Sequence, residues 1–142
     1  MGMDKLHAMT ASEPQELLVL LEGYKEDYRY QLYDNFKIGA EANNYTLESV
    51  GSSHGDAGNS LYNHVGMKFT TKDRKNHGTL NTNCAELYKG AWCFRSCYTS
   101  HLCGKYGENN NAQGIVWETF GKNNYNLKRA TMMIRPRRFS SN

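Results

Sequence analysis

The four cysteines of this sequence are clustered, and their clustering limits the folds open to it. Cys84, Cys93, Cys97 and Cys103 fall within twenty residues of a 142-residue chain. They lie in a segment, roughly residues 70–113, that carries few signals of regular secondary structure. A long irregular segment inside a compact domain is usually functional or held in place by something else. We therefore expect cross-links to hold this part of the chain.

Two kinds of cross-link fit these cysteines. Together with His101 they form the pattern C-x8-C-x3-C-x3-H-x-C, which offers the sulfur and nitrogen ligands that zinc prefers. The pattern lacks the paired C-x2-C knuckles of common zinc sites. Disulfides would stabilise a loop-rich region by ~2–4 kcal/mol each and would indicate an oxidising compartment. The glycosylation sequon at Asn44, Asn-Tyr-Thr, is compatible with secretion.

Length and hydropathy exclude several classes of protein. A chain of 142 residues with 39% apolar residues is the size of one globular domain. Its mean hydropathy is −0.76 and its longest aliphatic run is Leu17–Leu21. A membrane-spanning helix needs ~20 apolar residues, so we expect no membrane span. The first fifteen residues also lack the features of a secretory signal, so we expect any export signal to lie outside this chain or to be absent.

The C-terminal segment is strongly basic. Residues 121–142 carry six lysines and arginines and no acidic residue. No helix-turn-helix, RNA-binding or zinc-finger pattern accompanies this charge. We therefore expect a solvated basic strand and tail, or one paired with the acidic N-terminal part, and no nucleic-acid partner.

Local patterns predict an alternation of short elements. Residues 4–9 favour a helix with Asp4 as its N-cap, and residues 15–21 fit either a helix or a buried strand. The other expected elements are strands at 28–33, 44–50, 114–119 and 125–134, a Gly- and Ser-rich loop at 51–59, and a turn at 121–124.

Several blocks of sequence, in the same order, resemble the fibrinogen C-terminal domain family, which includes ficolins, tachylectins, angiopoietins and tenascins. The blocks are FKIGAEANNYTL, GDAGNSLYNHVGMKFTTKDR, NCAELYKGAW, CYTSHLCGKY, GIVW and YNLKRATMMIRP. The resemblance covers essentially the whole chain, residues 1–142. It implies an α+β fold with a short helix, antiparallel strands and a long irregular, disulfide-held ligand-binding subdomain. Family domains exceed two hundred residues, so we expect this chain to match only the last two-thirds of one.

The resemblance also assigns the cysteines. It implies a disulfide between Cys84 and Cys97, with a cis peptide bond before Cys97. Cys93 and Cys103 stand where the family usually has tryptophan and asparagine. These two either form an additional disulfide or remain free thiols.

The family's calcium site is expected to be lost. Two aspartates of the family align with Lys75 and His77 in this sequence. Calcium requires oxygen ligands, roughly 6 to 8 in all. An ammonium group repels a divalent cation and a neutral imidazole is a poor ligand for it, so we expect no metal and no other cofactor.

The resemblance places a small ligand pocket beside that region. Ficolin-like and tachylectin-like members hold the acetyl group of a sugar there, between aromatic walls. The corresponding residues are Tyr88, Tyr98, Asn111, Ala112 and Asn123. Only Tyr88 and Ala112 match the family, and the two tyrosines fit equally well as packing over the disulfide.

These features lead to three functional hypotheses. The first is a secreted module that binds acetylated or microbial glycans in innate immunity without calcium. The second is a protein-binding head of the angiopoietin or tenascin kind, with a receptor or a sibling fibrinogen-related chain as its partner. The third is a truncated copy with little activity. We expect no enzyme, because no base or orienting residue accompanies His101 and the cysteines.

Overall fold

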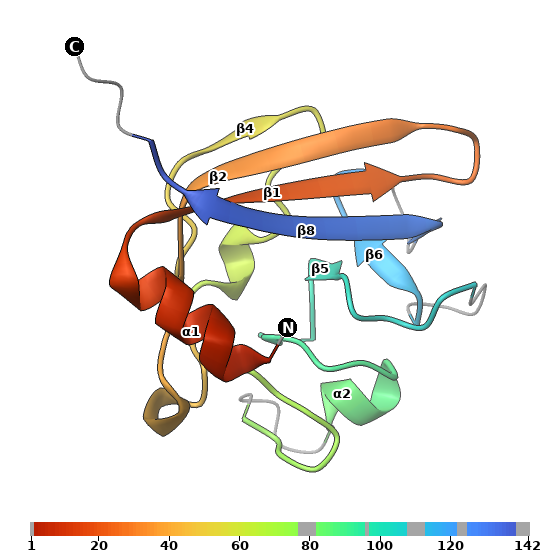
Figure 1. Cartoon of the computed structure of the whole chain (residues 1–142). Helices are drawn as coiled ribbons and strands as arrows, with labels where there is room; N and C mark the ends of the chain where they lie inside the picture. The colour runs from red at the N-terminus through yellow and green to blue at the C-terminus, as the bar shows by residue number, and fades with distance from the viewer. Residues whose placement is uncertain (1, 77–81, 96, 108–112, 122–124, 139–142) are drawn as a thin grey trace.

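The computed structural model describes residues 2–76, 82–95, 97–107, 113–121 and 125–138. These described residues form two sheets and two α-helices (Figure 1), which confirms the α+β class. In chain order the elements are α1 (Met3–Ser12), β1 (Gln15–Glu22), β2 (Tyr28–Ile38), the 3-10 turn η1 (Glu41–Asn43), β3 (Leu47–Ser49), β4 (Ser53–Gly55), the 3-10 turn η2 (Tyr62–His64), α2 (Cys84–Leu87), β5 (Ser100–His101), β6 (Ile115–Trp117), β7 (Asn126–Leu127) and β8 (Arg129–Pro136). Within the described residues, no helix has the length and apolar character needed to cross a membrane.

The larger sheet is antiparallel and has the order β3-β2-β1-β8, with β4 also paired to β2. The ambiguous segment 15–21 is its central strand, β1. Leu17, Val19 and Leu21 point into the core and are at most 2% exposed, whereas Leu20 on the other face is 40% exposed. Because successive side chains of a strand alternate between faces, one face of the sheet builds the core and the other stays open.

The smaller sheet has the order β5-β6-β7 and borders the irregular segment. Its central side chain, Trp117, is fully buried and donates its indole N–H to the carbonyl of Gly58 at 3.0 Å. Gly58 has a φ of +80°, and a Cβ there would lie 2.6 Å from Thr119. This close approach accounts for a glycine at position 58.

The first predicted elements need correction. Helix α1 begins earlier than predicted, with Gly2 as the N-cap, and Asp4 lies in its first turn. The Asp4 carboxylate faces the positive end of the helix dipole and accepts a hydrogen bond from the Tyr45 hydroxyl. The strand predicted at 44–50 shrinks to β3, because Asn44 and Tyr45 have positive φ angles of 53° and 48°, which a strand does not accommodate.

Two later predictions also differ from the structure. The predicted loop 51–59 contains strand β4, which hydrogen-bonds to β2 through backbone groups whatever its side chains are. The predicted strand 125–134 is two strands in different sheets. They separate at Lys128, whose backbone N–H donates to the carbonyl of Glu22 at 2.8 Å. The turn predicted at 121–124 includes residues 122–124, which lie outside the described ones.

Candidate functional site

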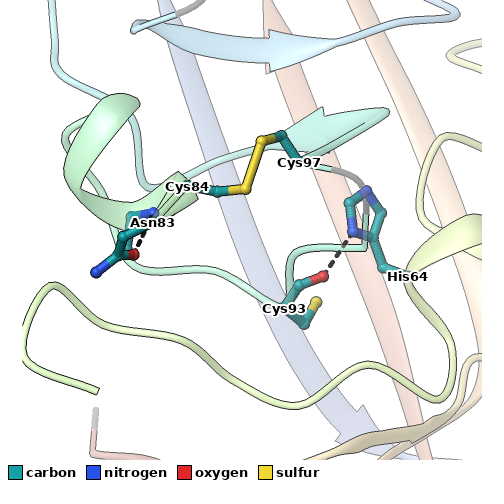
Figure 2. The surroundings of a disulfide bond; sticks show 6 residues. His64, Asn83, Cys84, Cys93 and Cys97 are labelled. Atoms are coloured by element: carbon teal, nitrogen blue, oxygen red, sulfur yellow. Dashed lines mark hydrogen bonds between the residues drawn. A yellow bond between two sulfur atoms is a disulfide. The ribbon is translucent and has the colours of Figure 1, made fainter. Parts of the chain in front are cut away.

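The Cys84–Cys97 disulfide frames the irregular segment (Figure 2). Cys84 is the first residue of α2, whose N-cap, Asn83, accepts a hydrogen bond from the backbone N–H of Ala85. The two α-carbons lie 5.5 Å apart, within the usual range for a disulfide. The bond that the resemblance implied is therefore present. It also rules out a zinc site built from all four cysteines, because two of the sulfurs are covalently joined.

Cys93 and Cys103 are free thiols. Cys93 is 8% exposed and belongs to the hydrophobic core, whereas Cys103 lies in an exposed turn. The two residues occupy different environments, and the additional disulfide is not formed. Burial raises the pKa of the Cys93 thiol to about 12 and also raises that of Cys103.

This difference predicts the order in which the thiols react. A thiol-specific reagent should label Cys103 first, because Cys103 is exposed to solvent. It should reach Cys93 only after unfolding, because this thiol lies in the core, where its reactive thiolate form is strongly disfavoured. Labelling followed by mass spectrometry of the peptides measures both rates, and Cys103→Ser should remove the fast phase. A native protein with all four cysteines oxidised, or with Cys93 labelled first, would contradict this assignment.

His64 ties the two sides of the disulfide region together. Its ring is fully buried, and Nδ1 lies 2.7 Å from the carbonyl oxygen of Cys93 (Figure 2). Nε2 accepts hydrogen bonds from the backbone N–H groups of Thr99, at 3.2 Å, and Ser100, at 3.1 Å. This set of partners fixes the neutral tautomer with the proton on Nδ1. Burial lowers the pKa of His64, which keeps the ring neutral.

Tyr88 and Tyr98 come together beside the disulfide. Their rings meet edge to face with centroids 4.8 Å apart, a favourable aromatic geometry. Both side chains are partly buried, and burial raises the pKa of Tyr98. The buried ring of His101 lies behind Tyr98, with centroids 5.5 Å apart. The pair thus has an aromatic backing and retains some exposure to solvent.

The backbone on which this pair stands is strained. Lys89 follows Tyr88 with a φ of 58°, and Cys97 precedes Tyr98 with a φ of 63°. Residues other than glycine rarely adopt this left-handed conformation, and such residues cluster at ligand-binding and active sites. Both tyrosines are therefore held in place by local backbone geometry as well as by the disulfide.

The described residues contain only part of the predicted site. Asn111, Ala112, Asn123 and His77 lie outside them, as does Ser96, so the predicted cis bond does too. The structure therefore does not show which pocket residues join Tyr88 and Tyr98. The chain on either side of segment 108–112 is described. There the backbone N–H of Lys105 donates to the carbonyl of Gln113 at 2.8 Å, and the Gln113 side chain donates to the carbonyl of Leu87 at 3.2 Å.

The described residues near the family's calcium positions have their own interactions. Asp73 accepts a hydrogen bond from the Thr71 hydroxyl at 2.6 Å, and this bond lowers the pKa of Asp73. Lys75 adds a positive charge two residues later. In the part of the chain that the structure describes, no three His, Cys, Asp or Glu side chains gather as a metal site would require. The loss of the family's calcium site therefore stays a prediction.

Sequence reasoning did not find the role of His64. A single histidine within a matching block carries no periodic or spacing signal, and its hydrogen-bond partners lie 29 to 36 positions away. The sequon at Asn44 lies in a partly exposed turn that closes η1, where the Asn44 N–H donates to the carbonyl of Glu41. Such a turn is compatible with a glycosylation acceptor.

Comparison with known proteins identifies relatives over nearly the whole chain. Residues 1–137 match the model of the C-terminal globular domain of fibrinogen beta and gamma chains. The chain is 39% identical over 144 residues to human fibrinogen C domain-containing protein 1, covering 96% of this chain and 31% of that protein. It is 37% identical over 137 residues to chicken tenascin-R, covering 96% of this chain and 10% of that protein. The chain thus spans a third or less of these relatives.

Solved structures agree with this assignment. The fibrinogen-like globe domain of human ANGPTL6 superposes with a TM-score of 0.88 at 32% identity, covering 97% of this chain and 64% of that one. A lamprey fibrin D-dimer complexed with the peptide Gly-His-Arg-Pro-amide has the same TM-score at 30% identity, covering 99% of this chain and 51% of that one. The fold of this chain is therefore that of a fibrinogen-like globe over the matched region.

Proposed function

Because the chain belongs to the fibrinogen C-terminal domain family, we propose that it is an extracellular recognition module that binds acetylated glycans beside Tyr88 and Tyr98. The observation that carries this proposal is the edge-to-face tyrosine pair next to the Cys84–Cys97 disulfide. Two fixed aromatic rings offer an apolar wall for a methyl group, and a few polar groups around such a wall can orient a carbonyl. An acetyl group combines both features. Recognition of microbial glycans in innate immunity is the role that we propose for this site.

The cellular location that we propose for the protein, and the calcium independence of its binding, are argued from the same region. A disulfide persists in an oxidising compartment, which supports an extracellular location. We propose calcium-independent binding, because Lys75 places a cation near the position where the family's ion would lie. A single head would bind weakly, so useful avidity requires that several heads act together.

Retention on resin carrying an acetylated sugar tests this function. We expect the folded protein to bind with calcium or with a chelator, and to elute with free acetate. Tyr88→Ala should weaken retention by at least about ten-fold, because truncating a tyrosine that acts as a binding hot spot costs about 2 kcal/mol or more. Tyr62→Ala is the matched control, since Tyr62 is 65% exposed and lies on η2. Equal retention of both variants, or no retention of the parent protein, would overturn the proposal.

The comparisons favour a second candidate, a protein-binding head. Relatives of this chain include tenascin-R and angiopoietin-like globe domains, and one solved relative is complexed with a peptide. In this second candidate function, the surface around Tyr88 and Tyr98 contacts a receptor or a sibling fibrinogen-related chain. Sugar arrays and peptide arrays probed with the same protein separate the two candidates. Binding to a peptide, blocked by Tyr88→Ala and not by free acetate, would favour the second.

A further inference from the structure

The turn that carries the Asn-Tyr-Thr sequon leaves the side chain of its asparagine unused. The backbone N–H of Asn44 donates to the carbonyl of Glu41 at 2.8 Å, and its carbonyl accepts from the N–H of Phe69 at 3.0 Å. Among the described residues, no group forms a hydrogen bond with the side-chain amide of Asn44, which is partly exposed. The fold therefore fixes the backbone of this residue and leaves its amide nitrogen available.

Other asparagines of the fold use their side chains to hold it. The Asn59 side chain accepts a hydrogen bond from the Tyr33 hydroxyl at 3.0 Å, and the Asn83 side chain donates to the carbonyl of Lys72 at 3.0 Å. At Asn44 the turn requires only a left-handed backbone, with φ 53° and ψ 38°, which glycine adopts as readily. The amide of Asn44 thus has no structural role in the turn.

The whole sequon lies at the surface in one tight turn. Asn44 and Tyr45 both have left-handed backbone conformations, and the Tyr45 hydroxyl donates to Asp4 of α1. The Thr46 hydroxyl donates to the carbonyl of Asn43 at 2.6 Å, and Thr46 is partly exposed. An N-linked oligosaccharide is bulky and solvated, so it requires an acceptor on a surface turn of this kind.

A hollow beside the sequon offers room for a sugar. Its volume is about 330 Å³, near the lower end of the range of about 300–1,000 Å³ for small-molecule pockets. The Glu48 carboxylate accepts hydrogen bonds, the Lys68 ammonium donates them, and the Asn43 amide does both. This lining suits the hydroxyl and acetamido groups of a single hexosamine. The lining residues are Ala42, Asn43, Asn44, Thr46, Glu48 and Lys68.

The hollow is separate from the candidate binding site. It shares no residue with the tyrosine pair, Tyr88 and Tyr98. Figure 1 shows the brown turn of residues 41–43 below α1, apart from α2 and the smaller sheet. An oligosaccharide on this turn would leave the surface around the two tyrosines open.

We propose that Asn44 is an N-glycosylation site and that the first N-acetylglucosamine of its oligosaccharide lies in this hollow, against Glu48 and Lys68. The donor is an oligosaccharide joined through pyrophosphate to a membrane lipid. The amide nitrogen of Asn44 bonds to the anomeric carbon of the first sugar, while the bond from that carbon to the pyrophosphate oxygen breaks. The lipid pyrophosphate leaves with the bonding electrons, and the amide loses one proton. This inference rests on the extracellular location that we propose, and not on the binding of acetylated glycans.

Expression of the full chain behind a cleavable secretion signal in eukaryotic cells tests the modification. Medium and cell extract are both analysed, because the transfer precedes secretion. We expect the mass of the intact protein to exceed that of the chain by one oligosaccharide, which peptide-N-glycosidase removes, converting Asn44 to aspartate. Asn44→Gln and Thr46→Ala should abolish the modification, and Thr46→Ser should retain it, because serine preserves the sequon. Asn43→Gln is the matched control and should retain it, since Asn43 begins no sequon.

Amide hydrogen exchange tests the position of the sugar. Trimming with an endoglycosidase leaves one N-acetylglucosamine on Asn44, and the Asn44→Gln variant serves as the sugar-free reference. We expect residues 46–48 and 68 to exchange at least about two-fold more slowly in the trimmed protein. Lys68→Ala should reduce this protection, whereas Lys25→Ala, which removes an exposed lysine between β1 and β2, should leave it unchanged.

The outcomes separate this inference from the proposed function. A parent chain without oligosaccharide in both medium and extract would overturn the site, as would an oligosaccharide that persists in Asn44→Gln. Equal exchange with and without the sugar would overturn its position in the hollow. A glycosylated chain that acetylated-sugar resin does not retain would contradict the proposed function alone, and an unmodified chain that the resin retains would contradict this inference alone.

Discussion

Replacing His64 with alanine should lower the free energy of unfolding by about 4 kcal/mol. The ring is fully buried and satisfies the backbone groups of Cys93, Thr99 and Ser100 at 2.7 to 3.2 Å. Alanine would leave these three groups without a partner, and an unsatisfied buried group costs about 1–3 kcal/mol. It would also open a cavity. Single domains are stable by only about 5–15 kcal/mol, so the variant should be close to unfolding.

Urea unfolding followed by circular dichroism measures this loss. His54→Ala is the matched control, because His54 lies exposed on β4 and its removal should change the stability by less than about 0.5 kcal/mol. If His64→Ala does not fold, His64→Gln retains an amide that can donate and accept, and should be destabilised less. A loss below about 1 kcal/mol for His64→Ala would show that the backbone groups find other partners.

His64 also connects the core to the candidate binding site. It lies on η2 and forms hydrogen bonds to the irregular segment on both sides of Cys97, at Cys93 and at Thr99. The disulfide joins Cys97 to α2, which leads directly into Tyr88. One covalent bond and one buried ring thus fix the two segments that carry the tyrosine pair. This preorganisation reduces the entropy that a ligand must overcome.

Local patterns predicted much of the large sheet and little of its topology. Alternation identified the start of β2, but residues 15–21 stayed ambiguous because a short apolar run fits a buried strand and a helix equally well. The two strands within 125–134 were merged because nothing in their composition marks Lys128 as a branch point between sheets. That branch depends on a hydrogen bond to Glu22, more than a hundred positions away. Long-range pairing of this kind leaves no local signal.

The site was accessible only through resemblance. The spacing of the cysteines left zinc and disulfides open, and the family pattern selected Cys84 and Cys97, which the structure pairs. The sequence did not predict that the face of the large sheet opposite the core stays exposed. Leu18, Leu20, Tyr30 and Leu32 have the composition of core strands, and sequence alone does not tell which face of a sheet remains uncovered.

Acid should destabilise this fold well before its carboxylates titrate, because two buried histidines must stay neutral. His101 is fully buried among the rings of Trp92, Phe94 and Tyr98. Neither of its ring nitrogens meets a hydrogen-bond partner within the described structure. Burial lowers the pKa of His101 to about 4, the nearby His64 lowers it further, and the backbone of Gly90 acts in the opposite direction.

The direction of the pH effect follows from proton linkage. In the unfolded chain a histidine has a pKa of about 6.5, so between pH 6.5 and 4 the unfolded state binds a proton that the folded state excludes. The stability that depends on a neutral His101 is therefore fully present above about pH 6.5. It falls as the pH decreases, and the loss from His101 reaches roughly 3 kcal/mol at pH 4. His64, whose pKa is also lowered by burial, adds to the same slope.

Urea unfolding at several pH values between 7.5 and 4.5 tests this linkage. His101→Phe keeps an aromatic ring among its neighbours and removes the titrating group, so the loss of stability per pH unit should become clearly smaller, whatever the variant's stability at pH 7.5. His54→Gln removes an exposed histidine and should leave the slope unchanged. An unchanged slope in His101→Phe would mean that His101 takes up its proton in the folded state at an ordinary pKa. The backbone of Gly90, which favours the protonated ring, would then outweigh the effect of burial.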